Sequence, residues 1–309
     1  MTKSWDVAVV GEVFVDHIFS GFDRWPEPGE EHITQNYVRE VGGGAAITAC
    51  GLARLGKDVA IFAMVGKQDG WLDERLRGFG VRLDDLRRSA TATAVSVSIS
   101  TREDRSFFTW PGANAGLPQY LIEPETRLRL TLSRHVHFAM PIARELAVLL
   151  FPQLRAANCT LSLDLGYHPD WLRDQRNWLT CGEVDFFLPN EKEAQIMAGN
   201  ADPERLLNCL RSKGVDNVVL KLGRIGAAAA LNGKTYSATA LPVDVVDTTG
   251  AGDAFDAGLI DALLDHAPPA EMLQRACACG SLSTRRPGAL SALPDREELN
   301  EFHELLKQH

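Results

Sequence analysis

The sequence predicts an α/β fold in which helices cover both faces of a mostly parallel β-sheet, with a small second sheet attached as a lid. Short apolar runs alternate with helical patterns along most of the 309 residues. That alternation is typical of a parallel sheet with helices on both faces. The lid is predicted from strands in which apolar and polar residues alternate, a pattern typical of a sheet with one open face. We expect one domain over residues 1–309.

Six short apolar runs are expected to form the buried strands of the main sheet: 7–11, 58–66, 135–140, 159–165, 184–190 and 217–223. Between them, apolar residues recur at three- and four-residue spacing, which predicts helices. These helices are expected at 45–56, 143–157, 191–199 and 203–214. A further strand is expected at 240–246, followed by a helix that begins near Gly250 or Ala251.

The lid is expected from three segments with two-residue periodicity. Residues 93–100 alternate apolar and serine side chains, residues 105–110 continue the pattern, and residues 30–41 carry a weaker version of it. We interpret them as a lid built from inserted segments at about 12–40 and 91–115, although edge strands of the main sheet would show the same pattern. The exposed edge of such a sheet favours a homodimer formed through the lid.

Composition and charge exclude several classes of protein. The net charge of −9 argues against a nucleic-acid partner, and no apolar run of 18 residues exists that could span a membrane. The six cysteines are scattered through expected helices and strands, and no secretion signal precedes them. We therefore expect reduced thiols and a cytoplasmic location.

The most informative segment is DTTGAGDAF, residues 247–255, which joins an expected strand to an expected helix. Its glycines permit close backbone approach, and the first N–H groups of a helix form a cradle for anions. A carboxylate at Asp253 would repel a bound phosphate. It is well suited, however, to accept the proton of a hydroxyl that attacks phosphorus. A plain helix N-cap is the alternative for this residue.

DTTGAGDAFDAGL resembles the C-terminal signature of the ribokinase-like (PfkB) family of carbohydrate kinases, and the similarity extends from Gly11 to about Pro294. The resemblance implies a three-layer sandwich with a β-sheet lid and an ATP-dependent sugar kinase that uses Mg²⁺. At matching positions it implies that Asp253 is the catalytic base. The implied anion hole consists of Gly250, Ala251 and Gly252, and Thr248 is expected beside ATP.

Other stretches resemble the family's nucleotide side. PNEKEA resembles its N-x-x-E pattern, which implies that Asn190 lies near the phosphates and that Glu193 acts on Mg²⁺ through water. A capped helix start explains the same residues. KLGRIG resembles the loop that passes close to ATP, with Lys221, Gly223 and Gly226 at the matching positions. Further along, Cys277 stands on the adenine side where relatives often have Asn.

A monovalent cation loop is implied by the same resemblance. Asp247 and Thr249 match its start, and the segment from Ser283 to Ala289 is expected to complete it. The residues that would bind K⁺ are then Asp247, Thr249, Ser283 and Gly288.

The N-terminal half resembles the family's sugar-binding side. Asp16 ends the first predicted strand, and VGGGAAITACG resembles a glycine pair that enters a helix. Many members have Asn where this chain has Ile47, so one sugar contact is lost, and Thr48 is a substitute. The expected substrate-binding residues are Asp16, Gly42, Gly43, Thr48 and Asn114.

The sequence therefore predicts an ATP-dependent kinase that phosphorylates a hydroxymethyl group of a small sugar such as fructose, ribose or 2-keto-3-deoxygluconate. Two alternatives stay open. A nucleoside kinase of the same fold would use an aromatic clamp, for which Phe14, Phe108 and Trp110 are candidates. A non-catalytic sugar or nucleotide sensor would bind these ligands without turnover.

Overall fold

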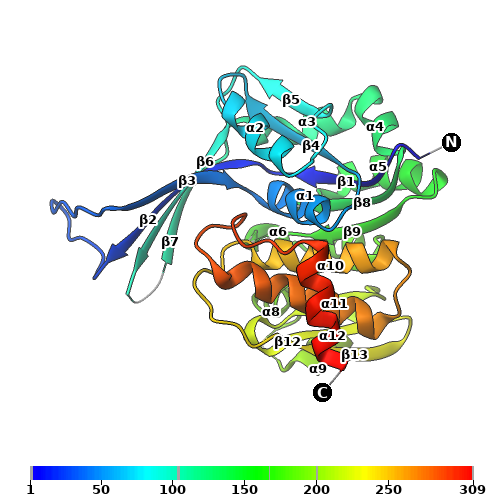
Figure 1. Ribbon diagram of the computed structural model, residues 1–309. Helices are drawn as coiled ribbons and strands as arrows, with labels where there is room; N and C mark the ends of the chain where they lie inside the picture. Colours follow the sequence, from blue (N-terminus) through cyan, green and yellow to red (C-terminus); the bar gives the residue numbers. More distant parts are fainter. Residues whose placement is uncertain (1–2, 103–104, 167, 200, 308–309) are drawn as a thin grey trace.

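The computed structural model describes residues 3–102, 105–166, 168–199 and 201–307, which form a large sheet between helices and a separate small sheet (Figure 1). The large sheet has nine strands in the order β13-β12-β11-β10-β9-β8-β1-β4-β5. Their bounds are β1 Trp5–Gly11, β4 Val59–Gly66, β5 Leu86–Ser89, β8 Ser133–Ala139, β9 Thr160–Asp164, β10 Phe186–Phe187, β11 Val218–Lys221, β12 Gly226–Leu231 and β13 Lys234–Thr239.

The strands from β5 to β11 are parallel, and β12 and β13 continue the sheet as an antiparallel hairpin. The prediction of a strand at 240–246 is wrong. That segment is an irregular connection whose Val245 and Val246 are more than half exposed. Pro242 has no N–H for a strand ladder. The N–H of Val246 donates instead to the carbonyl oxygen of Thr284 at 2.8 Å.

Helices cover both faces of the large sheet, as the sequence predicts. One face packs against α1, α2, α10 and α11, and the other against α3, α5, α8 and α9. No helix in the described part of the chain is long and apolar enough to cross a membrane. The helices are α1 Gly44–Arg54, α2 Gly70–Gly78, α3 Leu117–Ile122, α4 Pro124–Leu130, α5 Arg144–Ala156, α6 Pro169–Arg173, α7 Trp178–Gly182, α8 Glu191–Ala198, α9 Pro203–Ser212, α10 Ala251–Leu264, α11 Pro269–Leu282 and α12 Arg296–Lys307.

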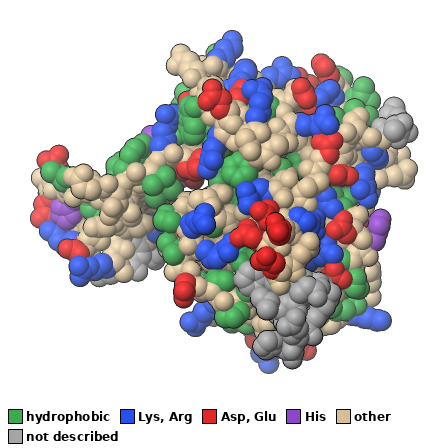
Figure 2. Space-filling model, in the orientation of Figure 1, with side chains coloured by type: hydrophobic (Ala, Val, Ile, Leu, Met, Phe, Trp, Pro, Cys, Tyr) green, Lys and Arg blue, Asp and Glu red, His purple; other side chains and the backbone are tan. Residues whose placement is uncertain are grey.

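The small sheet, called the lid below, projects from the body and contains β2 Phe14–Phe22, β3 Asn36–Gly42, β6 Ala94–Thr101 and β7 Arg105–Trp110 (Figures 1 and 2). It is separate from the main sheet, so the edge-strand alternative is excluded. Residues paired across strands share a face. Asp16, Ser96 and Thr109 are aligned on one face. Val95, Val97, Phe108 and Trp110 lie on the other.

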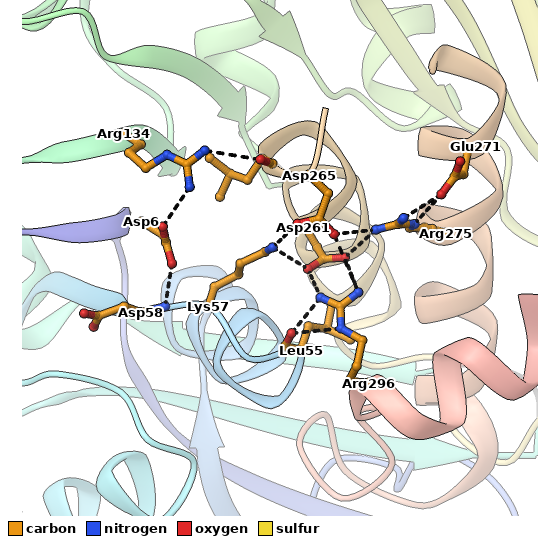
Figure 3. Close-up of polar contacts among 11 residues, drawn as sticks. Asp6, Leu55, Lys57, Asp58, Arg134, Asp261, Asp265, Glu271, Arg275 and Arg296 are labelled. Carbon is orange, nitrogen blue, oxygen red and sulfur yellow. Dashed lines mark hydrogen bonds and ion pairs between the residues drawn. The ribbon is translucent and has the colours of Figure 1, made fainter. Parts of the chain in front are cut away.

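Helix α10 is anchored at its C-terminal half by a buried carboxylate, Asp261 (Figure 3). The side chain of Asp261 is fully buried and pairs with Lys57 at 3.3 Å, with Arg275 at 3.2 Å and with Arg296. Arg296 also donates to the carbonyl oxygen of Leu55 at 2.7 Å. Three helices, α10, α11 and α12, are thus tied to the end of α1.

Candidate active site

The candidate site begins at the N-terminus of α10. Gly250 caps the helix with φ 74°, in the left-handed region that favours glycine. A Cβ there would lie 2.7 Å from the Cβ of Ala289 and 3.1 Å from Ile47 Cδ1, so the close packing also requires glycine. The side chain of Ile47 therefore packs beneath the turn.

The backbone of this turn is suited to hold an anion. The N–H of Ala251 donates to the carbonyl oxygen of Thr248 at 3.2 Å, so it is engaged within the turn. The N–H groups of Gly252 and Asp253 belong to the first helical turn, which supplies no acceptor for them and carries partial positive charge. Gly252 is exposed. Of the expected anion hole, Gly252 therefore presents an N–H group that is suited to bind an anion, and the N–H of Asp253 adds a second.

Two carboxylates, Asp16 and Asp253, converge on the glycine turn before α1. A Cβ at Gly42 would lie 2.0 Å from Asp16 Oδ2, and a Cβ at Gly44 would lie 2.9 Å from Asp253 Oδ1. These glycines therefore make room for the acids. The carboxylate of Asp16 is the least of the charges that raise the pKa of Asp253, so the two acids are close enough to interact.

The pKa values of both acids lie near neutrality. Burial, followed by the charge of Glu40, raises the pKa of Asp16 to about 7. Burial, followed by the charge of Asp164, raises the pKa of Asp253 to about 7. A carboxylate with a pKa near the working pH is effective as a general base.

The side chain of Lys221 points toward two buried acids next to Asp253. Its Nζ donates to Asp164 Oδ2 at 2.9 Å and to both oxygens of Asp256 at 3.3 Å. The side chain is only 11% exposed. The ammonium of Lys221 is thus held by two carboxylates, and its contact with an ATP phosphate stays a prediction.

Asn190 and Glu193 form a capping box at the start of α8. The N–H and Nδ2 of Asn190 donate to the two carboxylate oxygens of Glu193 at 2.8 and 2.7 Å, and the N–H of Glu193 donates back to Asn190 Oδ1 at 2.9 Å. The capped helix start is thus confirmed. Glu193 is nonetheless buried beside the acids of the site, and burial, followed by the charge of Asp164, raises its pKa to about 7.

The residues expected near the nucleotide base lie in different environments. Gly223 is on an exposed turn at φ 57°, with open space where a Cβ would be. Gly226 is buried, and a Cβ there would lie 2.1 Å from the carbonyl oxygen of Ala238, so this glycine serves the packing of β12 on β13. Cys277 is buried in the α10–α11 core, with Sγ 3.8 Å from the same carbonyl.

Arg105 of the lid reaches the DTTG turn. Its Nη1 donates to Asp247 Oδ1 at 3.0 Å, and its guanidinium also contacts the hydroxyls of Thr248 and Thr249. The other oxygen of Asp247 accepts from the N–H of Gly288 at 2.9 Å. Of the expected potassium ligands, Asp247 and Thr249 are therefore engaged by protein groups, and the Ser283 hydroxyl donates to the Gly280 carbonyl oxygen.

Three expected substrate residues have structural contacts. Asn114 is buried, and its side-chain amide exchanges hydrogen bonds with the backbone of Val13. Thr48 is fully buried, and its hydroxyl donates to the carbonyl oxygen of Asp253 at 3.2 Å. A Cβ at Gly43 would lie 2.3 Å from the carbonyl oxygen of Glu12. The side chains of Asn114 and Thr48 thus contact the backbone beside Asp16 and at Asp253, and the substrate-binding roles of these residues stay predictions.

The sequence analysis did not single out Asp256, which is fully buried beside the site. A signal was present, because Asp256 lies three residues after Asp253 in a helix whose neighbouring residues are small or apolar, and that spacing places both on one helical face.

Comparison with known proteins agrees with this geometry. Residues 5–296 match the pfkB family carbohydrate kinase profile. The chain is 27% identical to the 2-dehydro-3-deoxygluconokinase of Bacillus subtilis, over 89% of this chain and 90% of that protein. It is 26% identical to the ribokinase of Haemophilus influenzae, over 96% and 98%.

Solved structures have the same fold. An Arabidopsis thaliana ribokinase complexed with ribose and ATP superposes with a TM-score of 0.83 at 25% identity, over 97% of this chain and 98% of that chain. A putative ribokinase II of E. coli in complex with ATP and Mg²⁺ superposes with a TM-score of 0.81 at 23% identity, over the full length of both.

The chain therefore belongs to the pfkB family of carbohydrate kinases. It is a phosphotransferase with the ribokinase-like fold, as the resemblance of its signature motifs implies.

Proposed function

We propose that this kinase transfers the γ-phosphoryl group of ATP to a hydroxymethyl group of a small sugar of the fructose, ribose or 2-keto-3-deoxygluconate class. The observation that carries the proposal is the convergence of Asp16 and Asp253 at the glycine turn, beside the N-terminus of α10. The relatives named 2-dehydro-3-deoxygluconokinase, ribokinase and fructokinase support the substrate class.

Asp253 acts as general base in the proposed reaction. The sugar hydroxyl, held by Asp16, gives its proton to Asp253 as its oxygen forms a bond to the γ-phosphorus, and the bond from that phosphorus to the β-phosphate oxygen breaks to release ADP. The N–H groups of Gly252 and Asp253 stabilise the negative charge on the phosphoryl group in the transition state of the transfer. A base with a pKa near 7 makes the rate rise with pH through that value.

Mg²⁺ would accompany ATP, and Glu193 is the residue expected to interact with it. Both oxygens of Glu193 already accept hydrogen bonds from Asn190, so it fits a metal held through water and not a directly bound one. Mg²⁺ keeps several waters in protein sites. When bound, the ion neutralises charge on the phosphates.

Potassium remains a prediction at Asp247, Thr249, Ser283 and Gly288. The contact between Arg105 and Asp247 supports competition at this site, because a cation at Asp247 would have to displace the guanidinium. When no cation is bound, the guanidinium of Arg105 supplies one positive charge near the turn.

A homodimer through the lid is also proposed. The lid face opposite Asp16 carries Phe108 and Trp110, which are 58% and 50% exposed. Hydrophobic side chains are visible along the projecting sheet (Figure 2). A second copy that packs there would remove these aromatic rings from water.

One experiment separates the candidate activities. Purified protein is given ATP, Mg²⁺ and, in turn, fructose, ribose, 2-keto-3-deoxygluconate, inosine and adenosine, and ADP release is followed. Turnover of a free sugar supports the proposal. Turnover of nucleosides alone supports the nucleoside kinase, for which the strand register favours Phe107 over Phe108 or Trp110 as an aromatic neighbour. Thermal stabilisation without turnover identifies a sensor.

A further inference from the structure

A buried ammonium group lies behind the carboxylate of Asp253. The Nζ of Lys221, at the end of β11, is held between Asp164 of β9 and Asp256 of α10. Both Asp164 and Asp256 are buried. Charged groups at such positions require partners, because burial removes their hydration.

The same acids adjoin Asp253. One oxygen from each of Asp164, Asp253 and Asp256 lies within 4.8 Å of the others. The Cβ position at Gly252 is 3.6 Å from Lys221 Nζ, so the ammonium also lies close to the backbone that would hold the phosphoryl group. Carboxylates this close together disfavour one another's ionisation. Lys221 supplies a positive charge to this cluster.

We propose that Lys221 is a positioning residue for phosphoryl transfer, which offsets the charge of Asp164 and so keeps the Asp253 carboxylate ionised and turned toward the substrate. The inference rests on the proposed role of Asp253 as general base. In this role Lys221 acts on the general base Asp253 and not on an ATP phosphate, and Asp256 is the second partner of the ammonium.

The charges around Asp253 define the direction of the effect. Burial, Asp164 and Asp16 raise the pKa of Asp253, and Lys221 lowers it. Burial alone would raise the pKa of Asp164, but Lys221 and the hydrogen bond from Asp256 together outweigh burial, and the net pKa is lowered, whereas that of Asp256 is raised. The titratable and charged groups that face Asp253 or its partners are Asp16 of β2, His137 of β8, Asp164 of β9, Glu193 of α8, Lys221 of β11 and Asp256 of α10.

A purely structural ion pair would also be buried and would also join β9, β11 and α10. The two roles differ in one observable, the pH at which Asp253 titrates. Loss of Lys221 leaves the negative charge of Asp164 uncompensated and must move that pH upward. Loss of both acid partners leaves the ammonium as the nearest charge and must move it downward. If the ion pair had only a structural role, both variants would be less stable, and the titration midpoint of Asp253 would not move in opposite directions in the two.

The test is a ¹³C NMR titration of full-length protein labelled at aspartate carboxyls. The signal of Asp253 is assigned by its absence from D253N. We expect Lys221→Met to raise the Asp253 midpoint by about one pH unit or more, and the double variant D164N/D256N to lower it, since each unit reflects a modest change in charge interactions. The control is Asp261→Asn, on the same helix but in the distant network of Figure 3, and its midpoint should equal that of wild type.

The pH profile of kcat/KM with the sugar that turns over provides the second readout. In K221M the pH at which kcat/KM reaches half its maximum on the acidic side should rise by the same number of pH units as the Asp253 midpoint. The rate at pH 6 then falls about tenfold and recovers at pH 9. An Asp253 midpoint that is unmoved in folded K221M, or that moves the same way in both variants, would overturn the role of Lys221. If K221M does not fold, the Asp253 midpoint in the double variant D164N/D256N decides the question, and a midpoint that is not lowered there overturns the role of Lys221. Substantial turnover by D253N would instead overturn the general base, whatever the titrations show.

Discussion

Arg105 of strand β7 donates to Asp247 across 3.0 Å, which joins the lid to the turn that begins α10. The two residues are 142 positions apart in the chain, and their contact links the lid directly to the turn that contains the proposed anion hole. Closure of such a segment excludes water, which would otherwise compete as phosphoryl acceptor.

Arg105→Met should weaken this link. We expect KM for the sugar to rise on the order of tenfold, the scale of one charge-assisted hydrogen bond. We also expect activation by K⁺ to be larger than in wild type, because Asp247 is then released. Arg102→Met is the matched control, since Arg102 pairs with Asp23 at an exposed position of the same lid. Steady-state kinetics with K⁺ or a large organic cation measure both effects, and equal activation in wild type and R105M would contradict the competition.

Asp253→Asn should make the protein more stable at neutral and alkaline pH. The pKa of Asp253 is about 7 when folded and about 3.9 when unfolded, so the folded chain holds a proton that the unfolded chain has lost between these values. Stability from this group is therefore lost as pH rises through that window. We expect D253N to exceed wild type by about 1–3 kcal/mol at pH 8 and to match it at pH 4.

Urea unfolding at the two pH values measures this difference. A D253N protein that is less stable than wild type at pH 8 would show that the carboxylate is well solvated or paired, contrary to its raised pKa.

The sequence predicts the main sheet and the lid because their strands have different periodicities, which report burial on two faces or on one. It also predicts Asp16 and Asp253 as acids of the site, since each lies at the end of a recognisable motif. The partners of Lys221 were not predictable, because Asp164 and Asp256 are 57 and 35 residues away from it. Only the fold brings them together.

The wrong prediction of a strand at 240–246 also arises because tertiary packing is not visible in the local sequence. Residues 240–246 have the composition of a strand, yet Val245 and Val246 face outward and Val243 packs on a cluster that includes Leu241 and Leu282. Thr48 and Asn114 have side chains that a sequence motif assigns to the ligand, and their hydrogen bonds to the backbone could not be predicted from that motif, so their roles in substrate binding stay predictions. Local sequence gives the type of a side chain, whereas its direction depends on tertiary packing.

Removal of the buried charge at Asp261 should destabilise the fold without altering the chemistry. Asp261→Asn leaves Lys57, Arg275 and Arg296 without their shared partner, and breaking a buried pair of this kind costs about 3–5 kcal/mol. Thermal unfolding should therefore occur at a clearly lower temperature. A melting temperature equal to that of wild type would show that Asp265 replaces Asp261 as the partner of these cations.

The lid face opposite Asp16 should mediate self-association. We expect the double variant F108E/W110E to be monomeric at concentrations where wild type is dimeric, since two charges on an apolar face oppose its burial. Ile33→Glu is the control, because Ile33 is 81% exposed and lies outside the lid strands. Sedimentation velocity distinguishes the two states, and a wild type that is monomeric at every concentration would exclude this interface.

The most direct measurement is the turnover of Asp253→Asn with ATP, Mg²⁺ and the sugar that gives the highest rate for wild type. Asparagine keeps the size of the side chain but cannot accept the hydroxyl proton. We predict that kcat falls by about 10²–10⁴ while ATP still stabilises the protein against heat. A variant that keeps more than about a tenth of the wild-type rate would contradict the assignment of Asp253 as the general base.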